Sequence, residues 1–404
     1  MPDGAADYPL DELDGRTPLQ AAFTPRMDFL AANGLLGRAQ TIPAGMSPGS
    51  DVANLSLLGY DPKKYYSGRG PLEAASMGIG LNSDETAFRC NLVTVEDGIL
   101  KDYSAGHIST PEATSLIESI QRGLSDESFT FHPGVSYRHL MVAKGDFSAA
   151  ISQPPHDVMG KPVADILPVG EGSEFLRKLM FDSVEILERS EVNQARKAEK
   201  KNRANMIWLW GQGKAPSLPL FREEYGLEGG VISAVDLIKG IGRAAGLEAT
   251  TVPGATGYFD TDYLAKARFA LDVLKRKDFV FVHVEAPDEA GHVGNIKEKV
   301  NAIENFDEKI VGPIFEGLKK SGDFKIMIVP DHPTPIKVKT HTSDPVPWLI
   351  YRSTEKARSG ADSFCEASVR DSSLFFEEGF KLMGYFINNG SFEKKPSDSE
   401  VNEK

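Results

Sequence analysis

Aspartate and histidine side chains gather where two apolar runs of the chain end. Asp331 and His332 follow the run "FKIMIVP", and Asp288 and His292 follow "FVFVHVEAP" with the spacing Asp-x-x-x-His. His341 comes nine positions after His332. Side chains four positions apart share one face of a helical turn, so Asp288 and His292 can bind one ligand together. Carboxylate and imidazole donors together suit a divalent ion such as Mn²⁺, Zn²⁺ or Co²⁺.

Each of these residues taken alone also has a purely structural interpretation. An aspartate at a strand end commonly caps a helix or forms a turn, and a histidine is commonly hydrogen-bonded in a core or at a surface. His283, which lies inside one apolar run, is interpreted as a core residue or as a support for a ligand. The pattern alone leaves both interpretations open, and the grouping near strand ends is what favours a metal site.

The N-terminal part of the chain adds a hydroxyl group and a further carboxylate. Asp3 stands beside Gly4 in "PDGAADYP", and Ser50 stands in "SPGSDVANL" just before a segment compatible with a helix. The backbone N–H groups and the dipole at a helix N-terminus favour a phosphate group there. Taken alone, Ser50 is better interpreted as a plain helix cap. Beside two metal ions, however, a serine hydroxyl could become a nucleophile at neutral pH.

The elements that must position these residues are strands alternating with helices. Both apolar runs are β-branched or aromatic without clean alternation, which is typical of parallel strands buried on both faces. A helical pattern precedes each run, at residues 261–277 and 301–322. This order predicts an α/β fold with a mostly parallel sheet flanked by helices. Residues 85–205 show a different order of strand and helix patterns, which predicts a smaller inserted α+β domain. Residues 389–404 are polar and predict a disordered tail.

Composition restricts the class of protein to which the chain can belong. Its 404 residues favour two domains, and its net charge of −13 argues against a nucleic-acid-binding surface. We expect no membrane span, because no run of about 18 apolar residues occurs, and no secretory signal, because no basic and apolar leader opens the chain. Cys90 and Cys365 are the only cysteines and predict neither a disulfide framework nor a zinc site. We therefore expect a cytoplasmic protein.

Several motifs together resemble the archaeal type of the cofactor-independent (2,3-bisphosphoglycerate-independent) phosphoglycerate mutases. They span nearly all of residues 1–350 in the family's order: "PDGAADYP", "GMSPGSDVANLSLLGYDP", "YYSGRGPLEAASMGIGL", "WLWGQGKAP", "GGVISAVDLIKGIGRAAGL", "VPGATGYFDTDYLAKA", "HVEAPDEAGHVG" and "PDHPTP…HTSDPVP". This family belongs to the alkaline phosphatase superfamily of two-metal enzymes. The resemblance implies an alkaline-phosphatase-like metal-binding domain at residues 1–84 and 206–388, with a phosphotransferase domain inserted at residues 85–205.

The resemblance also implies roles for residues at matching positions. Ser50 matches the nucleophile that becomes phosphoserine. Six residues match the metal ligands: Asp3, Asp331 and His332 for the ion that also touches Ser50, and Asp288, His292 and His341 for the second ion. Mn²⁺ is the ion that we expect, with Zn²⁺, Co²⁺ and Mg²⁺ as alternatives. No 2,3-bisphosphoglycerate is expected to take part.

The inserted domain is expected to bind the glycerate carboxylate and hydroxyl groups. His107 in "SAGHIST" resembles a family position close to the transferring phosphoryl group. Arginine suits the recognition of carboxylate and phosphate through paired hydrogen bonds. The further basic candidates for substrate binding are Arg89, Arg138, His139, Lys214 and Lys239. Each of them also has an interpretation as a plain surface charge.

The start of the chain departs from the family's pattern. In the family an apolar strand of several residues precedes the first aspartate, whereas only Met1 and Pro2 precede Asp3 here. We therefore expect a native start that lies upstream and an Asp3 that is poorly held at a frayed terminus.

These features predict an enzyme that interconverts 3-phosphoglycerate and 2-phosphoglycerate in glycolysis and gluconeogenesis through a phosphoserine. Two alternatives stay open. A metal-dependent phosphate-ester hydrolase would use the same serine and ions, and a truncated non-catalytic member would retain only a shell that binds substrate. The inserted domain discriminates the first alternative, because only a mutase needs a clamp for the glycerate. Metal content discriminates the second.

Overall fold

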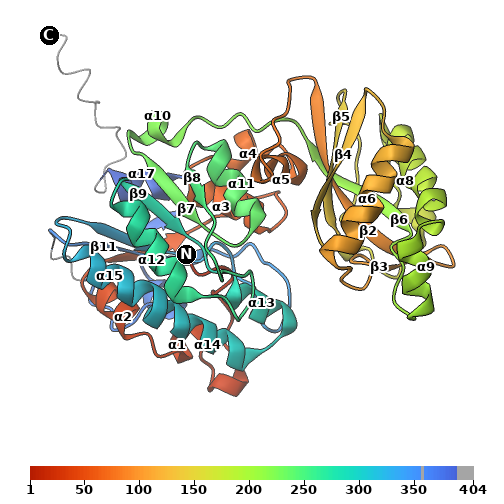
Figure 1. The fold of residues 1–404 in the computed structure, drawn as a ribbon. Coiled ribbons are helices and arrows are strands. Elements are labelled where there is room, and N and C mark those ends of the chain that lie inside the picture. The colour runs from red at the N-terminus through yellow and green to blue at the C-terminus, as the bar shows by residue number, and fades with distance from the viewer. Residues whose placement is uncertain (356–358, 389–404) are drawn as a thin grey trace, which may run out of the picture. The chain divides into compact units, whose positions relative to one another are not determined.

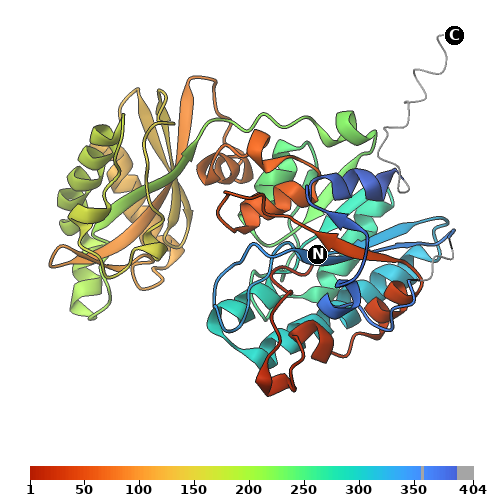
Figure 2. The same ribbon diagram turned by 180° about the vertical axis from the view of Figure 1, so that it is seen from behind.

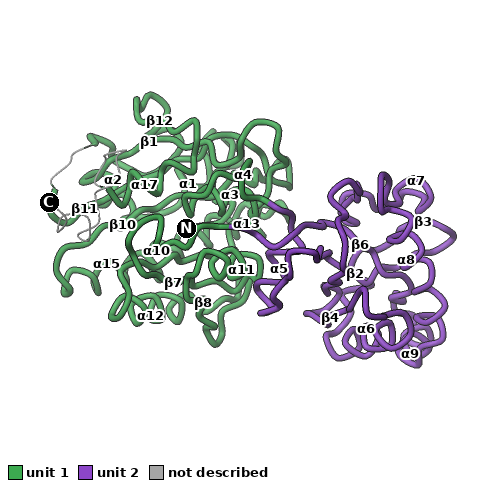
Figure 3. Tube along the Cα trace, turned by 90° about the horizontal axis from the view of Figure 1, so that it is seen from above, with its two compact units in different colours: residues 1–66, 218–404 green, residues 67–217 purple. Residues whose placement is uncertain are grey.

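A computed structural model describes residues 1–355 and 359–388, so the predicted disordered tail at residues 389–404 lies outside the described residues (Figure 1). The chain divides into two compact units (Figure 3). Unit 1 comprises Met1–Tyr66 and Leu218–Lys404, and unit 2 comprises Ser67–Ser217. Among the described residues, no helix is both long and apolar enough to cross a membrane. Cys90 and Cys365 are both free thiols in the interior.

Unit 1 holds two sheets within the described residues. The first is parallel, in the order β8-β7-β9, and the second has the order β10-β11-β1-β12. In the second sheet β11 runs antiparallel to both neighbours and β12 runs parallel to β1. The strands are β1 (Leu35–Ala39), β7 (Gly229–Ile232), β8 (Glu248–Thr250), β9 (Phe279–Val282), β10 (Lys325–Ile328), β11 (Val346–Arg352) and β12 (Phe375–Phe376).

Helices cover both faces of these sheets (Figures 1 and 2). They are α1 (Pro18–Ala21), α2 (Pro25–Ala32), α3 (Ser50–Leu57), α4 (Pro62–Tyr65), α10 (Phe221–Tyr225), α11 (Asp236–Ala244), α12 (Tyr263–Leu274), α13 (Ala286–Val293), α14 (Ile296–Phe306), α15 (Gly312–Leu318), α16 (Glu366–Val369) and α17 (Lys381–Ile387). A π-helical segment, Asp307–Val311, joins α14 to α15. The prediction of an α/β fold is confirmed, although β11 makes the second sheet less parallel than predicted.

The carboxyl ends of β9 and β10 carry the predicted ligands. The chain leaves β9 and enters α13, whose first turn contains Pro287, where a missing N–H costs no helical hydrogen bond. Asp288 and His292 then lie one turn apart on α13, as their spacing predicts. The chain leaves β10 through Val329 and Pro330 directly into Asp331 and His332. Because both sets of residues meet at one place, β9 and β10 point the same way.

The expectation of a frayed N-terminus is wrong for the structure of these residues. The α-amino group of Met1 donates to the carbonyl oxygen of Val282 at 2.8 Å. Val284 N–H donates to Met1 O at 3.1 Å, and Asp3 N–H donates to Val284 O at 2.9 Å. These bonds continue a parallel ladder beyond the end of β9. Asp3 is therefore fully buried and held in place by backbone pairing, although only two residues precede it.

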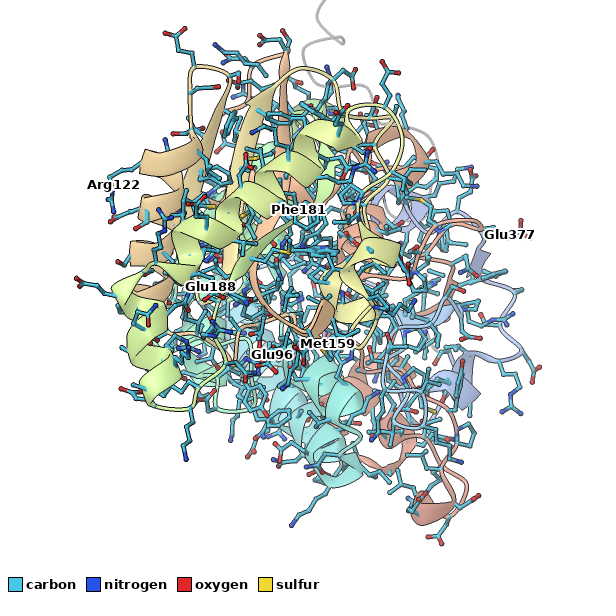
Figure 4. All side chains as sticks on the ribbon, turned by 90° about the vertical axis from the view of Figure 1, so that its right-hand side faces the viewer. Glu96, Arg122, Met159, Phe181, Glu188 and Glu377 are labelled. Atoms are coloured by element: carbon cyan, nitrogen blue, oxygen red, sulfur yellow. The ribbon has the colours of Figure 1, made fainter. Side chains whose placement is uncertain are left out.

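Unit 2 is an α+β unit built on one antiparallel sheet. The strand order is β3-β2-β5-β4, and β6 pairs with Ala87–Val93 of β2, along the edge of β2 opposite to β5. Its elements are α5 (Arg69–Ser76), β2 (Glu85–Glu96), β3 (Ile99–Asp102), α6 (Thr110–Leu124), β4 (Phe129–Val135), β5 (Arg138–Lys144), α7 (Val163–Ile166), α8 (Ser173–Glu188), α9 (Glu191–Ala198) and β6 (Met206–Gly213). Figure 4 shows α8 with Phe181 and Glu188. Phe181 is half exposed, whereas Leu176 and Met180 of the same helix are buried in the core of the unit.

The compact unit is wider than the inserted domain predicted at residues 85–205. It begins at Ser67 and ends at Ser217. The N-terminal boundary of the unit lies before α5, because Ala74 of this helix packs against Ala87 of β2 and Leu140 of β5. The cause at the other end is β6, which hydrogen-bonds along β2 although the prediction placed residues 206–388 in the metal-binding domain. Contacts between distant segments, which composition does not reveal, set both boundaries.

Candidate active site

Asp3, Asp331 and His332 form the inner group of candidate ligands. His332 Nε2 lies 3.4 Å from Asp331 Oδ2 and 3.6 Å from Asp3 Oδ1. All three side chains are fully buried in unit 1. Their ligand atoms lie within 4.8 Å of one another, which is close enough to bind a single ion. The structure thus brings together the three residues that the resemblance assigns to the first ion.

The Asp331 carboxylate is fixed by donors from three segments. Its Oδ1 accepts hydrogen bonds from the backbone N–H groups of Gly4 at 3.1 Å and His332 at 2.9 Å. Its Oδ2 accepts one from Asn54 Nδ2 at 2.9 Å. Gly4 has a φ of +59°, and a Cβ there would lie 2.5 Å from Thr334 Oγ1. The glycine in "PDG" is therefore required both for its backbone conformation and for the close approach of the N-terminal turn.

Asp288, His292 and His341 form the outer group. Asp288 Oδ2 lies 3.1 Å from His292 Nε2, and Asp288 Oδ1 lies 3.5 Å from His341 Nε2. The two Nε2 atoms are 3.0 Å apart. His292 Nδ1 lies 3.1 Å from the carbonyl oxygen of Lys339, so a proton on Nδ1 would leave Nε2 free to bind an ion. The side chains of His292 and His341 are 33% and 22% exposed, so solvent reaches both histidines, whereas Asp288 is buried.

The two groups are neighbours within unit 1. The ring centroids of His332 and His341 are 4.1 Å apart. Thr334 Oγ1 hydrogen-bonds to Asp288 and lies 3.2 Å from His332 Nδ1, so it touches one member of each group. Asp288, His332 and His341 also place ligand atoms within 4.8 Å of one another. The loop after β10 therefore delivers residues to both groups, as the resemblance implied.

Ser50 is the first residue of α3 and faces the inner group. Its Oγ lies 3.2 Å from His332 Nε2. Asn54, one turn further on, donates to Ser50 O at 2.8 Å and also to Asp331. Sequence analysis missed Asn54, although its spacing of four from Ser50 places it on the same helical face. The first turn of α3 thus positions a hydroxyl group beside the buried carboxylates.

The electrostatics of the inner group leave room for a cation. Burial and the nearby Asp331 carboxylate raise the pKa of Asp3 well above its usual range. Asp3 Oδ1 is buried and has no hydrogen-bond partner among the described residues. Burial alone would raise the pKa of Asp288, but hydrogen bonds from His292 and His341 hold it well below its usual range. An unpaired buried carboxylate oxygen is costly. The donor set therefore fits divalent ions.

His283 supports Asp3 from the side opposite the inner group. Its Nε2 lies 2.8 Å from Asp3 Oδ2 and 3.4 Å from Glu285 Oε2. Its Nδ1 lies 3.3 Å from Ser233 Oγ. Asp3, His283 and Glu285 also meet the distance requirement for a shared ion. With Asp3 Oδ2 held by His283, Oδ1 is left to face His332, which agrees with the interpretation of His283 as a supporting residue.

In unit 2 the structure groups some of the basic candidates but not all of them. The Arg89 guanidinium donates to Glu73 Oε1 at 2.7 Å and lies 4.9 Å from the ring centroid of Trp210. Arg138 pairs across the sheet with Asn91, two positions after Arg89, so both arginines project from one face. Burial, opposed by Glu73, lowers the pKa of Arg89 to about 10. Sequence analysis missed Glu73 and Trp210, both of which lie in the quoted motifs.

His107 and His139 sit in different surroundings. His107 is exposed and has a φ of +49°. The centroid of its ring lies 6.3 Å from that of Tyr137, and the guanidinium of Arg138 lies over the same Tyr137 ring. A positive φ at a residue other than glycine is uncommon and is found at functional sites. His139 lies on the opposite side of the strand from Arg138, pairs with Cys90 and is buried. The strand thus separates His139 from the arginine face.

The two lysine candidates have ordinary ion-pair partners. Lys214 Nζ lies 3.4 Å from Asp146 in unit 2. Lys239 Nζ lies 2.7 Å from Asp236 on α11 in unit 1. Within the described residues of unit 1, Lys239 makes no hydrogen bond or ion pair with the metal-ligand groups. Their role in substrate binding stays a prediction.

The chain is similar to known proteins over almost its whole length. The family model described as 2,3-bisphosphoglycerate-independent phosphoglycerate mutase matches residues 31–193. A protein of that name from Methanosarcina barkeri is 54% identical over 387 residues, covering 95% of this chain and 97% of the relative. The chain belongs to this family. A relative from Geobacter sulfurreducens, named a probable mutase of this kind, is 50% identical and covers 96% and 98% of the two chains.

Solved structures extend the mutase similarity to the fold. A protein from Pyrococcus horikoshii matches with a TM-score of 0.81 at 31% identity, covering 98% of this chain and 97% of its own. A cofactor-independent phosphoglycerate mutase from Thermoplasma acidophilum matches with a TM-score of 0.63 at 27% identity, covering 96% and 98%. The mutase resemblance stated from the motifs is therefore confirmed. The roles of individual residues stay predictions that the geometry makes specific.

Proposed function

We propose that this chain is an isomerase that interconverts 3-phosphoglycerate and 2-phosphoglycerate through a phosphoserine at Ser50. The reaction belongs to glycolysis and gluconeogenesis, takes place in the cytoplasm and needs no 2,3-bisphosphoglycerate. Unit 1 serves as the alkaline-phosphatase-like metal-binding domain, and unit 2 serves as the phosphotransferase domain. The proposal rests on family membership and on one geometric observation in unit 1.

That observation is the position of the Ser50 hydroxyl. Its oxygen is 3.2 Å from His332 Nε2, beside a carboxylate of Asp3 that is buried and partly unpaired. It also stands at the start of a helix, whose free N–H groups favour a phosphoryl group. A serine used only as a helix cap would not need buried aspartate and histidine side chains around its hydroxyl. This combination supports a nucleophile rather than a cap.

Two divalent ions fit the inner and outer groups. The inner ion would be held by Asp3, Asp331, His332 and Ser50, and the outer ion would be held by Asp288, His292 and His341. Bound there, Mn²⁺ (or Zn²⁺, Co²⁺ or Mg²⁺) would lower the pKa of the serine hydroxyl and offset the charge of the transferring phosphoryl group. Asn54 and the N–H groups of Gly4 and His332 keep the Asp331 carboxylate oriented toward such an ion.

The residues then carry out two successive transfers. Ser50 Oγ loses its proton and forms a bond to phosphorus, while the ester bond between phosphorus and the glycerate oxygen breaks and that oxygen takes up a proton. The glycerate stays bound and reorients. Its other hydroxyl loses a proton and attacks the phosphorus of the phosphoserine, the bond between phosphorus and Ser50 Oγ breaks, and Oγ takes up a proton. The two steps balance without net hydrolysis, provided that water is excluded while the phosphoserine exists.

Unit 2 would supply the residues that hold the glycerate. Arg89 and Arg138 project from one face of the sheet and suit the glycerate carboxylate. His107 would approach the phosphoryl group, and Lys214 and Lys239 are weaker candidates because each has an acidic partner. His139 lies on the opposite side of the strand and would support that face rather than contact the substrate.

The test is incubation of the protein with 3-phosphoglycerate and Mn²⁺, followed by separation of the products. Formation of 2-phosphoglycerate without free phosphate supports the proposal. Release of free phosphate as the main product would show that the chain is a phosphate-ester hydrolase instead. A protein that binds Mn²⁺ but forms neither product would correspond to a non-catalytic member of the family.

A further inference from the structure

A buried lysine lies where three segments of unit 1 that carry candidate metal ligands meet. These segments are the N-terminal segment (residues 3–7), the ligand loop (residues 331–341) and α13. Lys299 comes from α14, the helix that follows α13 and packs against it (Figure 1). Its side chain is fully buried. A buried ammonium group is costly unless it is paired and hydrogen-bonded, so its partners indicate its role.

The Lys299 ammonium group bonds to both the N-terminal segment and the ligand loop. Its Nζ donates to Asp7 Oδ2 at 2.7 Å, to Thr334 O at 2.8 Å and to Ala6 O at 3.3 Å. An ammonium group has three N–H donors, so these three acceptors match its full capacity. Asp7 and Ala6 belong to the N-terminal segment, and Thr334 belongs to the ligand loop. Lys299 therefore fastens these two segments to each other and to α14.

Asp7 makes a second connection between the same two segments. Its side chain is fully buried, and its Oδ2 accepts a hydrogen bond from Ile336 N–H of the ligand loop at 3.1 Å as well as the one from Lys299. The direct backbone bond between the segments, from Thr334 N–H to Ala6 O, is longer at 3.3 Å. The ion pair of Lys299 and Asp7 thus holds the ligand loop at two points, one carbonyl oxygen and one N–H group.

Thr334 is the residue through which Lys299 can act on both ligand groups. Thr334 Oγ1 hydrogen-bonds to Asp288 of the outer group and lies 3.2 Å from His332 Nδ1 of the inner group. Its carbonyl oxygen, which accepts from Lys299, also lies against Gly291 of α13, where a Cβ would approach that oxygen to 2.3 Å. The missing side chain of Gly291 and the donor of Lys299 together fix this carbonyl between α13 and α14.

We infer that Lys299 and Asp7 are positioning residues that fix the separation of the inner and outer groups, and with it the distance between the two ions. Because this role needs two ions, it rests on the proposed function. In two-metal sites the ions lie about 3.5–4 Å apart and act on the same reacting group, so a small displacement of one ligand group matters. A buried ion pair adds little net stability compared with apolar residues of similar volume, but it selects one arrangement of the chain.

Unit 1 offers a matched control in a second buried aspartate. Asp307 accepts hydrogen bonds from Met27 N–H at 2.7 Å and from Arg26 N–H at 3.3 Å, and it lies 3.6 Å from the Arg26 guanidinium. Like Asp7, it is a buried carboxylate that pairs with a cation and with backbone N–H groups. It joins the π-helical segment to α2, and the assigned metal ligands lie on neither of these elements. Asp307→Asn therefore reports the general cost of losing such a charge.

The test compares Lys299→Met, Asp7→Asn and Asp307→Asn with the unsubstituted protein. Titration with Mn²⁺ gives the affinity, electron paramagnetic resonance at saturating Mn²⁺ gives the magnetic coupling between the two ions, and thermal unfolding gives the stability. Asp7→Asn keeps the shape of the side chain and one acceptor oxygen, so it decides the question even if Lys299→Met does not fold.

We expect Lys299→Met and Asp7→Asn to weaken Mn²⁺ binding by about 10–100-fold, as for other residues that orient ligands, and to reduce the coupling between the ions. Asp307→Asn should lower the thermal midpoint and leave affinity and coupling unchanged. Unchanged affinity and coupling in Asp7→Asn would overturn the inference, and so would an equal loss in Asp307→Asn. If the unsubstituted protein itself shows no coupled pair of ions, the proposed two-ion site is wrong and the inference fails with it.

Discussion

Unit 1 and unit 2 concentrate opposite charges, and they do so by different means. Unit 1 buries Asp3, Asp331 and Asp288 together with histidines, and one oxygen of Asp3 has no hydrogen-bond partner within residues 1–355 and 359–388. Unit 2 gathers arginines on one face of its sheet, and Arg89 is paired with Glu73. A buried acidic group that lacks a cation is incomplete, whereas a paired arginine is stable as it stands. The comparison supports the proposal that unit 1 binds a cation and that unit 2 binds an anion.

Replacement of the proposed nucleophile, Ser50, should have the largest effect on activity. Ser50→Ala should reduce mutase turnover by on the order of 10⁴-fold or more, because it removes the atom that accepts the phosphoryl group. The fold should survive, since the change removes one oxygen at the start of α3. The measurement is the rate of 2-phosphoglycerate formation, together with the metal content and the thermal midpoint. Ser119→Ala, on the exposed face of α6, is the control. Normal turnover by Ser50→Ala at unchanged metal content would refute the mechanism.

Loss of metal ligands should have the next largest effect. Asp288→Ala and His341→Ala should each weaken the binding of one ion by more than the roughly 10–100-fold typical of residues that only support a ligand. Elemental analysis of each purified variant, followed by titration with Mn²⁺, measures this directly. Asp272→Ala, at an exposed position of α12, should retain both ions. Two tightly bound ions in both ligand variants would contradict the assignment of the outer group.

Removal of the guanidinium in unit 2 should act on substrate binding and leave the metals in place. Arg89→Lys keeps the charge but loses the planar pair of donors, so we expect kcat/KM to fall about 10-fold or more, mainly through a higher KM. Arg122→Lys on α6, which is exposed and labelled in Figure 4, is the matched control. Metal content should match that of the unsubstituted protein. If Arg89→Lys lowered the metal content and left KM unchanged, the proposal that unit 2 binds substrate and unit 1 binds metal would be contradicted.

The sequence predicted unit 1 better than unit 2 for a physical reason. In unit 1 the ligands directly follow strand ends or recur at helical spacing, so Asp288, His292, Asp331 and His332 could be found from the local pattern. Asn54 and Thr334 were missed because their contacts join segments that are distant in the sequence. In unit 2 the register of β2, β5 and β6 decides which basic side chains share a face. No local pattern contains that register, so Arg138 and His139 were treated alike although the strand separates them.

The smallest expected effect concerns His139 and separates a structural histidine from the ligand histidines. Burial, followed by the charges of Arg89 and Arg138, lowers the pKa of His139 to about 3, whereas an unfolded histidine titrates near 6.5. The unfolded state therefore binds the additional proton between these values, and the stability of unit 2 must fall as the pH falls through this window. The loss between pH 7 and pH 5 should be about 2 kcal/mol. His139→Gln should abolish this part of the pH dependence while KM stays unchanged. Denaturant unfolding of both proteins at the two pH values measures the difference, and identical pH dependence in the two proteins would contradict a pKa of His139 that burial lowers.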